Sequence, residues 1–105
     1  MLFVAEYEFD WEDLDAVVAK RMELENAMPE GFRFVGEYVW AEGDPAFRGV
    51  AIIDADSIEA LNAFVLHYGP SLAINAHPAS DVAGGISQVS GGVGVSRRRR
   101  KAKSY

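Results

Sequence analysis

The chain has 105 residues, half of them hydrophobic and a quarter charged, and it contains no cysteine. This length predicts one domain that buries only about 60–70% of the surface exposed by its unfolded chain, so association would help it. The absence of cysteine excludes disulfide frameworks, thiolate metal sites and a cysteine nucleophile. The short apolar start reaches Glu6 early and has no preceding positive charge, which fits neither a secretory signal nor a membrane span and predicts a cytoplasmic protein.

The net charge of −6 conceals two unlike parts of the chain. Residues 1–95 carry sixteen acidic and four basic side chains, whereas residues 96–105 carry six basic and no acidic ones. A basic end on an acidic body is typical of an interaction arm, or of an arm that folds back on its own body.

Residues 32–55 predict a β-hairpin. The first arm has a two-residue period, with Phe32, Phe34, Tyr38 and Trp40 on one parity. Residues 41–46, AEGDPA, supply the Gly, Asp and Pro that favour a turn. The second arm is apolar on both parities from Val50 to Ile53, which predicts burial on both faces.

The remaining elements follow from capping and periodicity. Asp10 is expected to cap the first helix, and Asp56, with Glu59 three residues later, the second. The expected order is a strand over 2–9, a helix over 11–27, the hairpin, a helix over 57–68 and a strand over 72–77.

This β-α-β-β-α-β order predicts an α+β, ferredoxin-like fold: a four-stranded antiparallel sheet with two helices on one face. The bare face should be polar if it meets water. Either choice of bare face instead keeps large apolar side chains, namely Val4, Val35, Val39, Val50 and Ile52 on one parity, or Phe34, Tyr38 and Trp40 on the other. We therefore expect a homodimer, a dimeric α/β barrel with a cavity between sheet and helices. The edge strands could pair further, so an assembly larger than a dimer is also compatible with the sequence.

The phrases MLFVAEYEF, FRFVGEYVW…GVAIIDA and DSIEALNAFV followed by LAINAHP resemble the dimeric α/β-barrel superfamily. Within it, the chain is similar to short prokaryotic proteins grouped as a domain of unknown function, over roughly residues 1–80. The superfamily includes cofactor-free monooxygenases of the antibiotic-biosynthesis type, muconolactone-isomerase-like enzymes, haem-dependent members and ligand-sensing regulatory domains. The resemblance implies the fold but leaves the activity open, because these members share no chemistry.

His67 and His77 are the weak catalytic candidates, because both flank the Gly69-Pro70 break, near where the superfamily's cavity opens. The structural alternative is a histidine favoured by the dipole in the last helical turn for His67, and a strand end for His77. No paired histidine or Glu-x-x-His spacing accompanies them, so neither a metal nor a cofactor is predicted.

The predicted ligand-binding residues are Glu6, Arg33, Tyr38, Trp40 and Tyr68. The charged members belong to a set that shares one parity within each strand and is expected on one sheet face inside the cavity: Glu6, Glu8, Arg33, Glu37 and Arg48. The alternative is that these charges point to water or pair across the dimer seam.

Residues 1–81 are predicted to form the folded domain, and residues 82–96, rich in Gly, Ser and Val, a flexible linker. The basic tail, residues 97–105, is predicted to bind a polyanion such as nucleic acid, or an acidic protein, through Arg97, Arg98, Arg99, Arg100, Lys101 and Lys103. The alternatives are that the tail wraps onto the acidic body, aids solubility or is a cloning remnant.

Three functions follow from these features. The first is a small cytoplasmic homodimer that binds a small hydrophobic ligand or has a regulatory role. The second is a cofactor-free monooxygenase or isomerase acting on a small hydrophobic substrate, with a histidine as base. The third is an interaction protein that uses its tail. The sequence leaves open whether the protein is an enzyme, and the acidic body argues against an RNA-recognition sheet.

Overall fold

The computed structural model describes residues 1–93. The elements in chain order are β1 (Leu2–Phe9), the short 3₁₀ helix η1 (Trp11–Asp13), α1 (Leu14–Asn26), β2 (Phe32–Ala41), β3 (Phe47–Ala55), α2 (Ile58–His67), the short 3₁₀ helix η2 (Gly69–Ser71), β4 (Ile74–Pro78) and α3 (Val82–Val93). Up to β4 this is the predicted β-α-β-β-α-β order.

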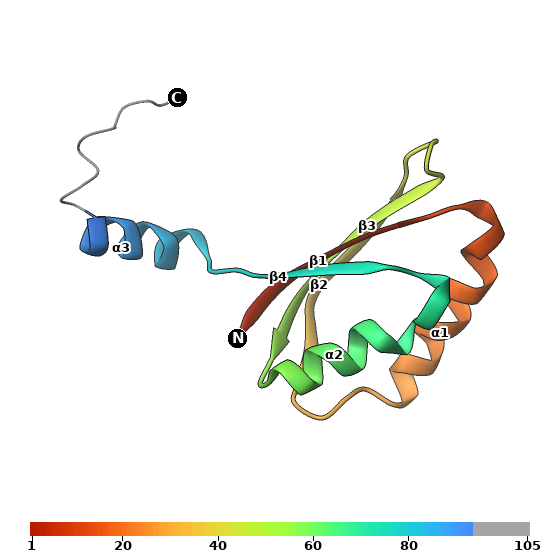
Figure 1. Ribbon diagram of the computed structural model, residues 1–105, viewed down its shortest axis with the longest axis horizontal. Helices are drawn as coiled ribbons and strands as arrows, with labels where there is room; N and C mark the ends of the chain where they lie inside the picture. The colour runs from red at the N-terminus through yellow and green to blue at the C-terminus, as the bar shows by residue number, and fades with distance from the viewer. Residues whose placement is uncertain (94–105) are drawn as a thin grey trace.

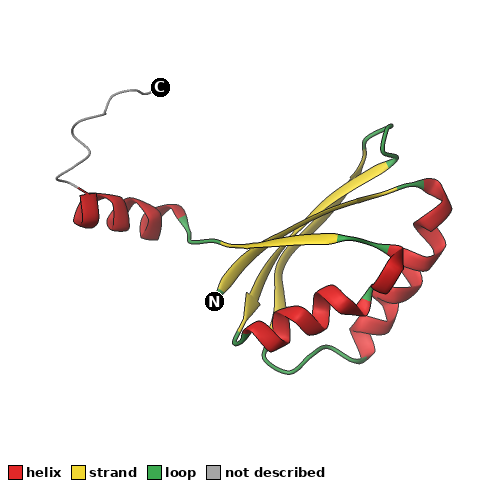
Figure 2. Ribbon diagram, in the orientation of Figure 1, coloured by secondary structure: helices red, strands yellow, loops and turns green. Residues whose placement is uncertain are grey.

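The four strands form one antiparallel sheet in the order β2-β3-β1-β4. Both α1 and α2 lie against the same face of this sheet (Figures 1 and 2). The predicted ferredoxin-like fold is therefore confirmed. We call the opposite face, which α1 and α2 leave uncovered, the open face.

The hydrophobic core lies between the sheet and the two helices. Phe3 and Ile53 enter it from β1 and β3, Leu24 from α1 and Phe64 from α2, and all four are almost fully buried. Burial of each such side chain stabilises the folded state by about 1.5–3 kcal/mol. Neighbouring strand positions point to the open face, where Val50 and Ile52 are only half-buried, so the expected burial on both faces is not complete within one chain.

Strand β2 contains a β-bulge. Phe34 pairs with Ile53 and Gly36 with the next residue back, Ile52, so Val35 is an additional residue in β2. Side chains alternate strictly along a strand, so one additional residue reverses the faces of all that follow. Phe34 faces the helices, whereas the later residues of its predicted set, Tyr38 and Trp40, face away, and the single parity predicted for this arm is wrong.

Two predicted helix caps are replaced by other contacts. Asp10 makes no side-chain cap; its Oδ1 instead accepts the Ala46 N–H at 3.0 Å, which ties the start of η1 to the hairpin turn. Helix α2 is capped by Ser57, whose Oγ accepts the Ala60 N–H at 3.1 Å. Both helices still begin within a few residues of the predicted positions.

Helix α3 occupies most of the stretch predicted to be a flexible linker, and in Figure 1 it projects away from the rest of the fold. Asp81 caps it, because its Oδ1 accepts the Gly84 N–H at 2.6 Å. Val82, Ile86 and Val89 have the i, i+4, i+7 spacing of one helix face, which the sequence interpretation overlooked. The basic tail lies outside the described residues.

None of the helices within residues 1–93 is both long and apolar enough to span a bilayer.

Candidate ligand-binding site

The sheet has a hollow on each of its faces. The inner cavity, of about 380 Å³, lies on the helix side between α1 and the strands. The outer pocket, of about 460 Å³, lies on the open face. Both volumes fall in the range of small-molecule sites, and Tyr7 borders both hollows.

The wall of the inner cavity is mostly apolar and comes from β1, α1, β2, β3 and the segment after α2. Its apolar members include Phe9, Leu14, Val17, Met22, Phe47 and Leu72. Val18, Met22 and Val39 are also strongly exposed, so they form an apolar rim. A wall of this kind favours an apolar ligand because burial removes apolar surface from water.

One ion pair joins α1 to β2 at the edge of the inner cavity. Arg21 donates from Nε and Nη2 to the two carboxylate oxygens of Glu37 at 2.8 and 2.9 Å, and from Nη1 to Glu25 at 3.0 Å. Its guanidinium lies 4.6 Å from the centre of the Phe34 ring. The Arg21 and Glu37 side chains are 27% and 30% exposed, so water screens this bidentate pair only partly. The bulge makes the pair possible by turning Glu37 toward α1.

Two tyrosines that are at least half-buried, Tyr7 and Tyr68, supply further polar groups to the inner cavity. Tyr68 is only 4% exposed, and neither its hydroxyl nor that of Tyr7 hydrogen-bonds to any residue described. Burial, followed by the Glu37 carboxylate, raises the pKa of Tyr68 to about 12, and burial also raises the pKa of Tyr7. Both phenols therefore stay protonated at neutral pH and act as hydrogen-bond donors rather than as bases.

Gly49 makes room for one of these tyrosines. It pairs with Tyr7 across β1 and β3, and a Cβ built on Gly49 would overlap the Tyr7 ring. The glycine is required here for close approach, and it keeps the phenol flat against the sheet.

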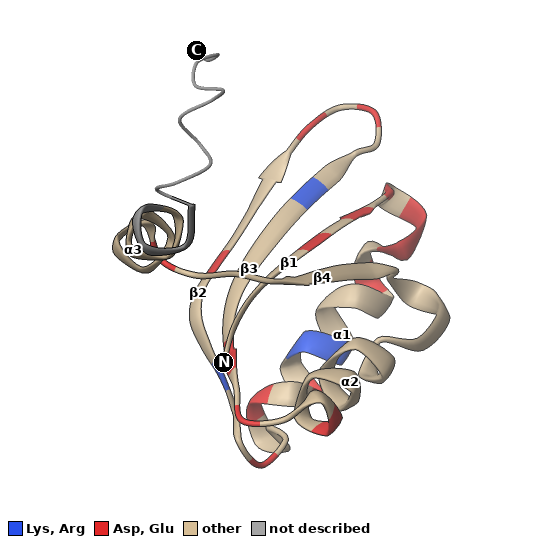
Figure 3. Cartoon of the chain, turned by 60° about the vertical axis from the view of Figure 1, so that its left-hand side comes forward, with Lys and Arg blue, Asp and Glu red and all other residues tan. Residues whose placement is uncertain are grey.

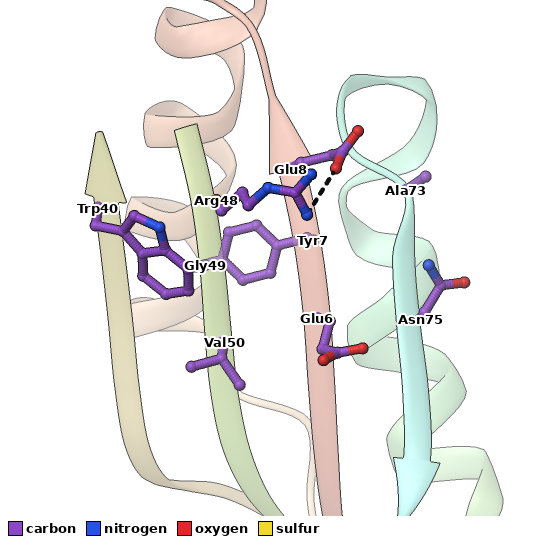
Figure 4. A pocket seen from close by; sticks show the side chains of 9 residues that line it. All are labelled: Glu6, Tyr7, Glu8, Trp40, Arg48, Gly49, Val50, Ala73 and Asn75. Atoms are coloured by element: carbon purple, nitrogen blue, oxygen red, sulfur yellow. Dashed lines mark ion pairs between the residues drawn. The ribbon is translucent and has the colours of Figure 1, made fainter. Parts of the chain in front are cut away.

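The outer pocket is polar and lies on the open face, as the close-up in Figure 4 shows. Arg48 and Glu8 form its ion pair at 3.2 Å. Trp40 borders it and donates from Nε1 to Glu42 at 2.7 Å. Arg48 and Glu8 are exposed, so their pair contributes at most about 1 kcal/mol.

The predicted ligand-binding residues do not meet in one place. Tyr68 lines the inner cavity, and Tyr38 borders it, although its ring lies against Gly36. Glu6 and Trp40 line the outer pocket. Arg33 lines neither hollow and pairs with Asp54 at 2.7 Å. The sheet thus separates residues that were expected to share a cavity.

Neither histidine lines either hollow. The Nε2 atom of His67 lies 2.8 Å from the backbone oxygen of Lys20, so this side chain joins α2 to α1. His77 is exposed on β4, with its Nε2 4.0 Å from Glu6. Within residues 1–93 no cluster of three or more His, Asp or Glu side chains could hold a metal ion.

The sequence interpretation did not select Arg21 for the inner cavity, and it put Glu37 on the wrong face. The i, i+4 spacing of Arg21 and Glu25 indicates only a surface pair. Nothing in the sequence marks Val35 as the additional residue of a bulge.

The fold and the site thus define a ferredoxin-like domain with a ligand-sized cavity beneath its helices. The family described as a domain of unknown function, DUF3303, matches residues 1–92, through most of α3, and the chain belongs to this family. This confirms the predicted kinship with a family of unknown function.

Solved structures similar to this chain include Rv0793 from Mycobacterium tuberculosis, at 13% identity and a TM-score of 0.45, with 78% of this chain and 96% of that chain covered. Another is a crystal structure of an antibiotic biosynthesis monooxygenase, at 16% identity and a TM-score of 0.45, with 77% and 100% covered. Likeness at this level adds nothing about activity. No curated protein sequence matches the chain significantly.

Proposed function

We propose that this protein is a small cytoplasmic homodimer that binds an apolar small molecule in the inner cavity. The observation that carries the proposal is Tyr68, a buried phenol that lines a cavity of about 380 Å³ and makes no hydrogen bond within the described residues. An unpaired buried hydroxyl costs about 1–3 kcal/mol, and a ligand that pairs with it recovers that energy.

The open face supports the homodimer. It carries Tyr38 and Trp40, both exposed, together with the half-buried Val4, Val50 and Ile52. Paired charges, Glu8 with Arg48 and Arg33 with Asp54, lie toward opposite ends of this apolar centre. An apolar centre with polar ends is typical of a surface that packs against a second copy.

The enzymatic alternative, cofactor-free oxygenation or isomerisation, lacks a base in the inner cavity. The histidines expected in that role lie outside it, and the two tyrosines stay protonated. Among the residues described, Glu37 is the one carboxylate in the lining, and both of its oxygens accept from Arg21. The available groups therefore favour binding over proton abstraction.

The proposal is tested with an uncharged fluorescent probe such as Nile red. We expect the full chain to bind it, and Val39→Trp, which enlarges a side chain at the rim, to weaken binding about tenfold or more. The control is Leu66→Trp on α2, because Leu66 is also exposed but lines neither hollow. Equal losses in both variants, or no binding to the unmodified chain, would contradict the proposal.

Native mass spectrometry of the purified protein is the complementary measurement. A dimer that carries a discrete additional mass supports both parts of the proposal. A monomer under all conditions contradicts the homodimer.

A further inference from the structure

The hydrogen-bonding groups of the inner cavity restrict what its ligand can be. Apart from Tyr38, whose side chain borders the cavity but is 62% exposed, four polar side chains line it: Tyr7, Arg21, Glu37 and Tyr68. Arg21 and Glu37 satisfy each other through two hydrogen bonds, and a third bond joins Arg21 to Glu25. The two phenols make no hydrogen bond to a described residue.

An anionic ligand is disfavoured by the charges around the inner cavity. Arg21 is the one cation in the lining, and the carboxylates of Glu37 and Glu25 together exceed its charge. An anion would therefore lose its hydration and gain no unpaired positive charge in return.

A cationic ligand is disfavoured because Glu37, the one carboxylate in the lining among the described residues, is already paired. Both oxygens of Glu37 already accept hydrogen bonds from Arg21. An ammonium group would have to displace a bidentate guanidinium that also rests on Phe34, and Arg is the better partner for a planar carboxylate.

An uncharged acceptor is the group that remains. Tyr68 offers an O–H donor at a site with 4% exposure, and a carbonyl or ether oxygen can accept from it without a charge being buried. On the basis of the function proposed above, we propose that the inner cavity takes an uncharged, largely apolar molecule with one hydrogen-bond-accepting oxygen, and that this oxygen binds the Tyr68 hydroxyl.

The test uses four probes of one shape and different polarity: methyl naphthyl ketone, isopropylnaphthalene, naphthoate and aminomethylnaphthalene. Their affinities for the full chain are measured by isothermal titration calorimetry. We expect the ketone to bind about tenfold more tightly than the hydrocarbon, because one hydrogen bond is gained and one buried donor is satisfied. We expect the anion and the cation to bind about tenfold or more weakly than the ketone.

Tyr68→Phe removes the donor and keeps the ring. We expect the ketone to lose its advantage over isopropylnaphthalene in this variant, while Asn62→Ala, at an exposed polar side chain of α2 that lines neither hollow, leaves the advantage unchanged. The carbonyl stretch of the bound ketone should shift to lower frequency in the unmodified protein but not in Tyr68→Phe.

The outcomes separate this inference from the function proposed above. If the ketone and the hydrocarbon bind equally well, or if Tyr68→Phe keeps the preference, the cavity binds ligands but the assigned acceptor is wrong. If naphthoate or the ammonium probe binds most tightly, the charge argument is wrong. If none of the four binds, including the hydrocarbon, the function itself fails and this inference with it.

Discussion

Tyr68→Phe should stabilise the protein without ligand at neutral pH. In the folded chain the Tyr68 hydroxyl is buried and has no hydrogen-bond partner among the described residues, whereas water solvates it in the unfolded chain. A buried donor of this kind costs about 1–3 kcal/mol. The substitution keeps the ring contacts with Phe64 and His67, at 5.9 and 5.6 Å between ring centres. We expect a gain of about 1 kcal/mol in the free energy of unfolding, measured by urea denaturation at fixed protein concentration.

The same substitution should change the alkaline limb of the stability curve. The pKa of Tyr68 is about 12 in the folded protein and 10.0 ordinarily. A raised pKa contributes stability that is complete below the unfolded value and is lost as the pH rises through the folded one. The window is therefore pH 10 to 12. Two pKa units correspond to about 2.7 kcal/mol, and because Glu37, which contributes to the shift after burial, is 30% exposed and partly screened by water, we expect about 1–2 kcal/mol.

Urea denaturation across this pH window provides the measurement, with Tyr38→Phe as the matched control. The unmodified chain and the control should lose stability with a similar slope, and Tyr68→Phe should lose about 1–2 kcal/mol less. Tyr7 also has a raised pKa, so some slope should remain in all three proteins. Destabilisation of Tyr68→Phe at neutral pH together with an unchanged alkaline slope would refute the reasoning, because it would mean that the hydroxyl has a partner.

Two other substitutions and one truncation test separate parts of the chain. Gly49→Ala should cost about 2–3 kcal/mol in urea denaturation, because its Cβ overlaps the Tyr7 ring; a change below about 0.5 kcal/mol would contradict that contact. Ile52→Glu should convert the proposed dimer to a monomer in size-exclusion chromatography with light scattering, whereas the helix-side control Leu66→Glu should not; a dimer in both would place the interface elsewhere. Removal of residues 94–105 should leave probe binding in the inner cavity unchanged and abolish any salt-dependent binding of oligonucleotides. If oligonucleotides bind independently of salt and still bind the truncated protein, the tail is not their binding site.

The fold could be predicted because it depends on coarse features of the sequence. Alternating Phe3, Ala5 and Phe9 mark one strand, and Gly43 with Pro45 marks the hairpin turn. These signals recur over many residues, so one misjudged position changes little. The predicted elements and their order therefore match the structure even where single caps, such as Asp10, serve another contact.

The site could not be predicted to the same degree, because it depends on the register of single residues. Val35 is an additional residue in β2, and it reverses the faces of Glu37 and Tyr38. With strict alternation, Glu37 belongs beside Arg33 on the open face; in the structure it lies under Arg21. The predicted set of five charges therefore contains four that face the open side and one that does not.

The stretch predicted to be a flexible linker is largely helical in the structure, and the sequence did not indicate this helix for a related reason. Five glycines between residues 84 and 94 lower helix propensity, and the composition alone indicates flexibility. The cap at Asp81 and the spacing of Val82, Ile86 and Val89 instead favour a helix. The sequence interpretation gave weight to the composition and none to the spacing.

The pairing of the few basic side chains connects the fold to the kind of partner it can accept. Figure 3 shows these basic positions among the more numerous acidic ones. Within residues 1–93 each of the four lies within 4.0 Å of a carboxylate: Lys20 of Glu23, Arg21 of Glu25 and Glu37, Arg33 of Asp54, and Arg48 of Glu8. A polyanion or an anionic ligand would have to break one of these pairs on a surface that is already acidic. In the described part of the chain no Lys or Arg is therefore left unpaired for such partners, which agrees with the proposal that the inner cavity takes an uncharged ligand.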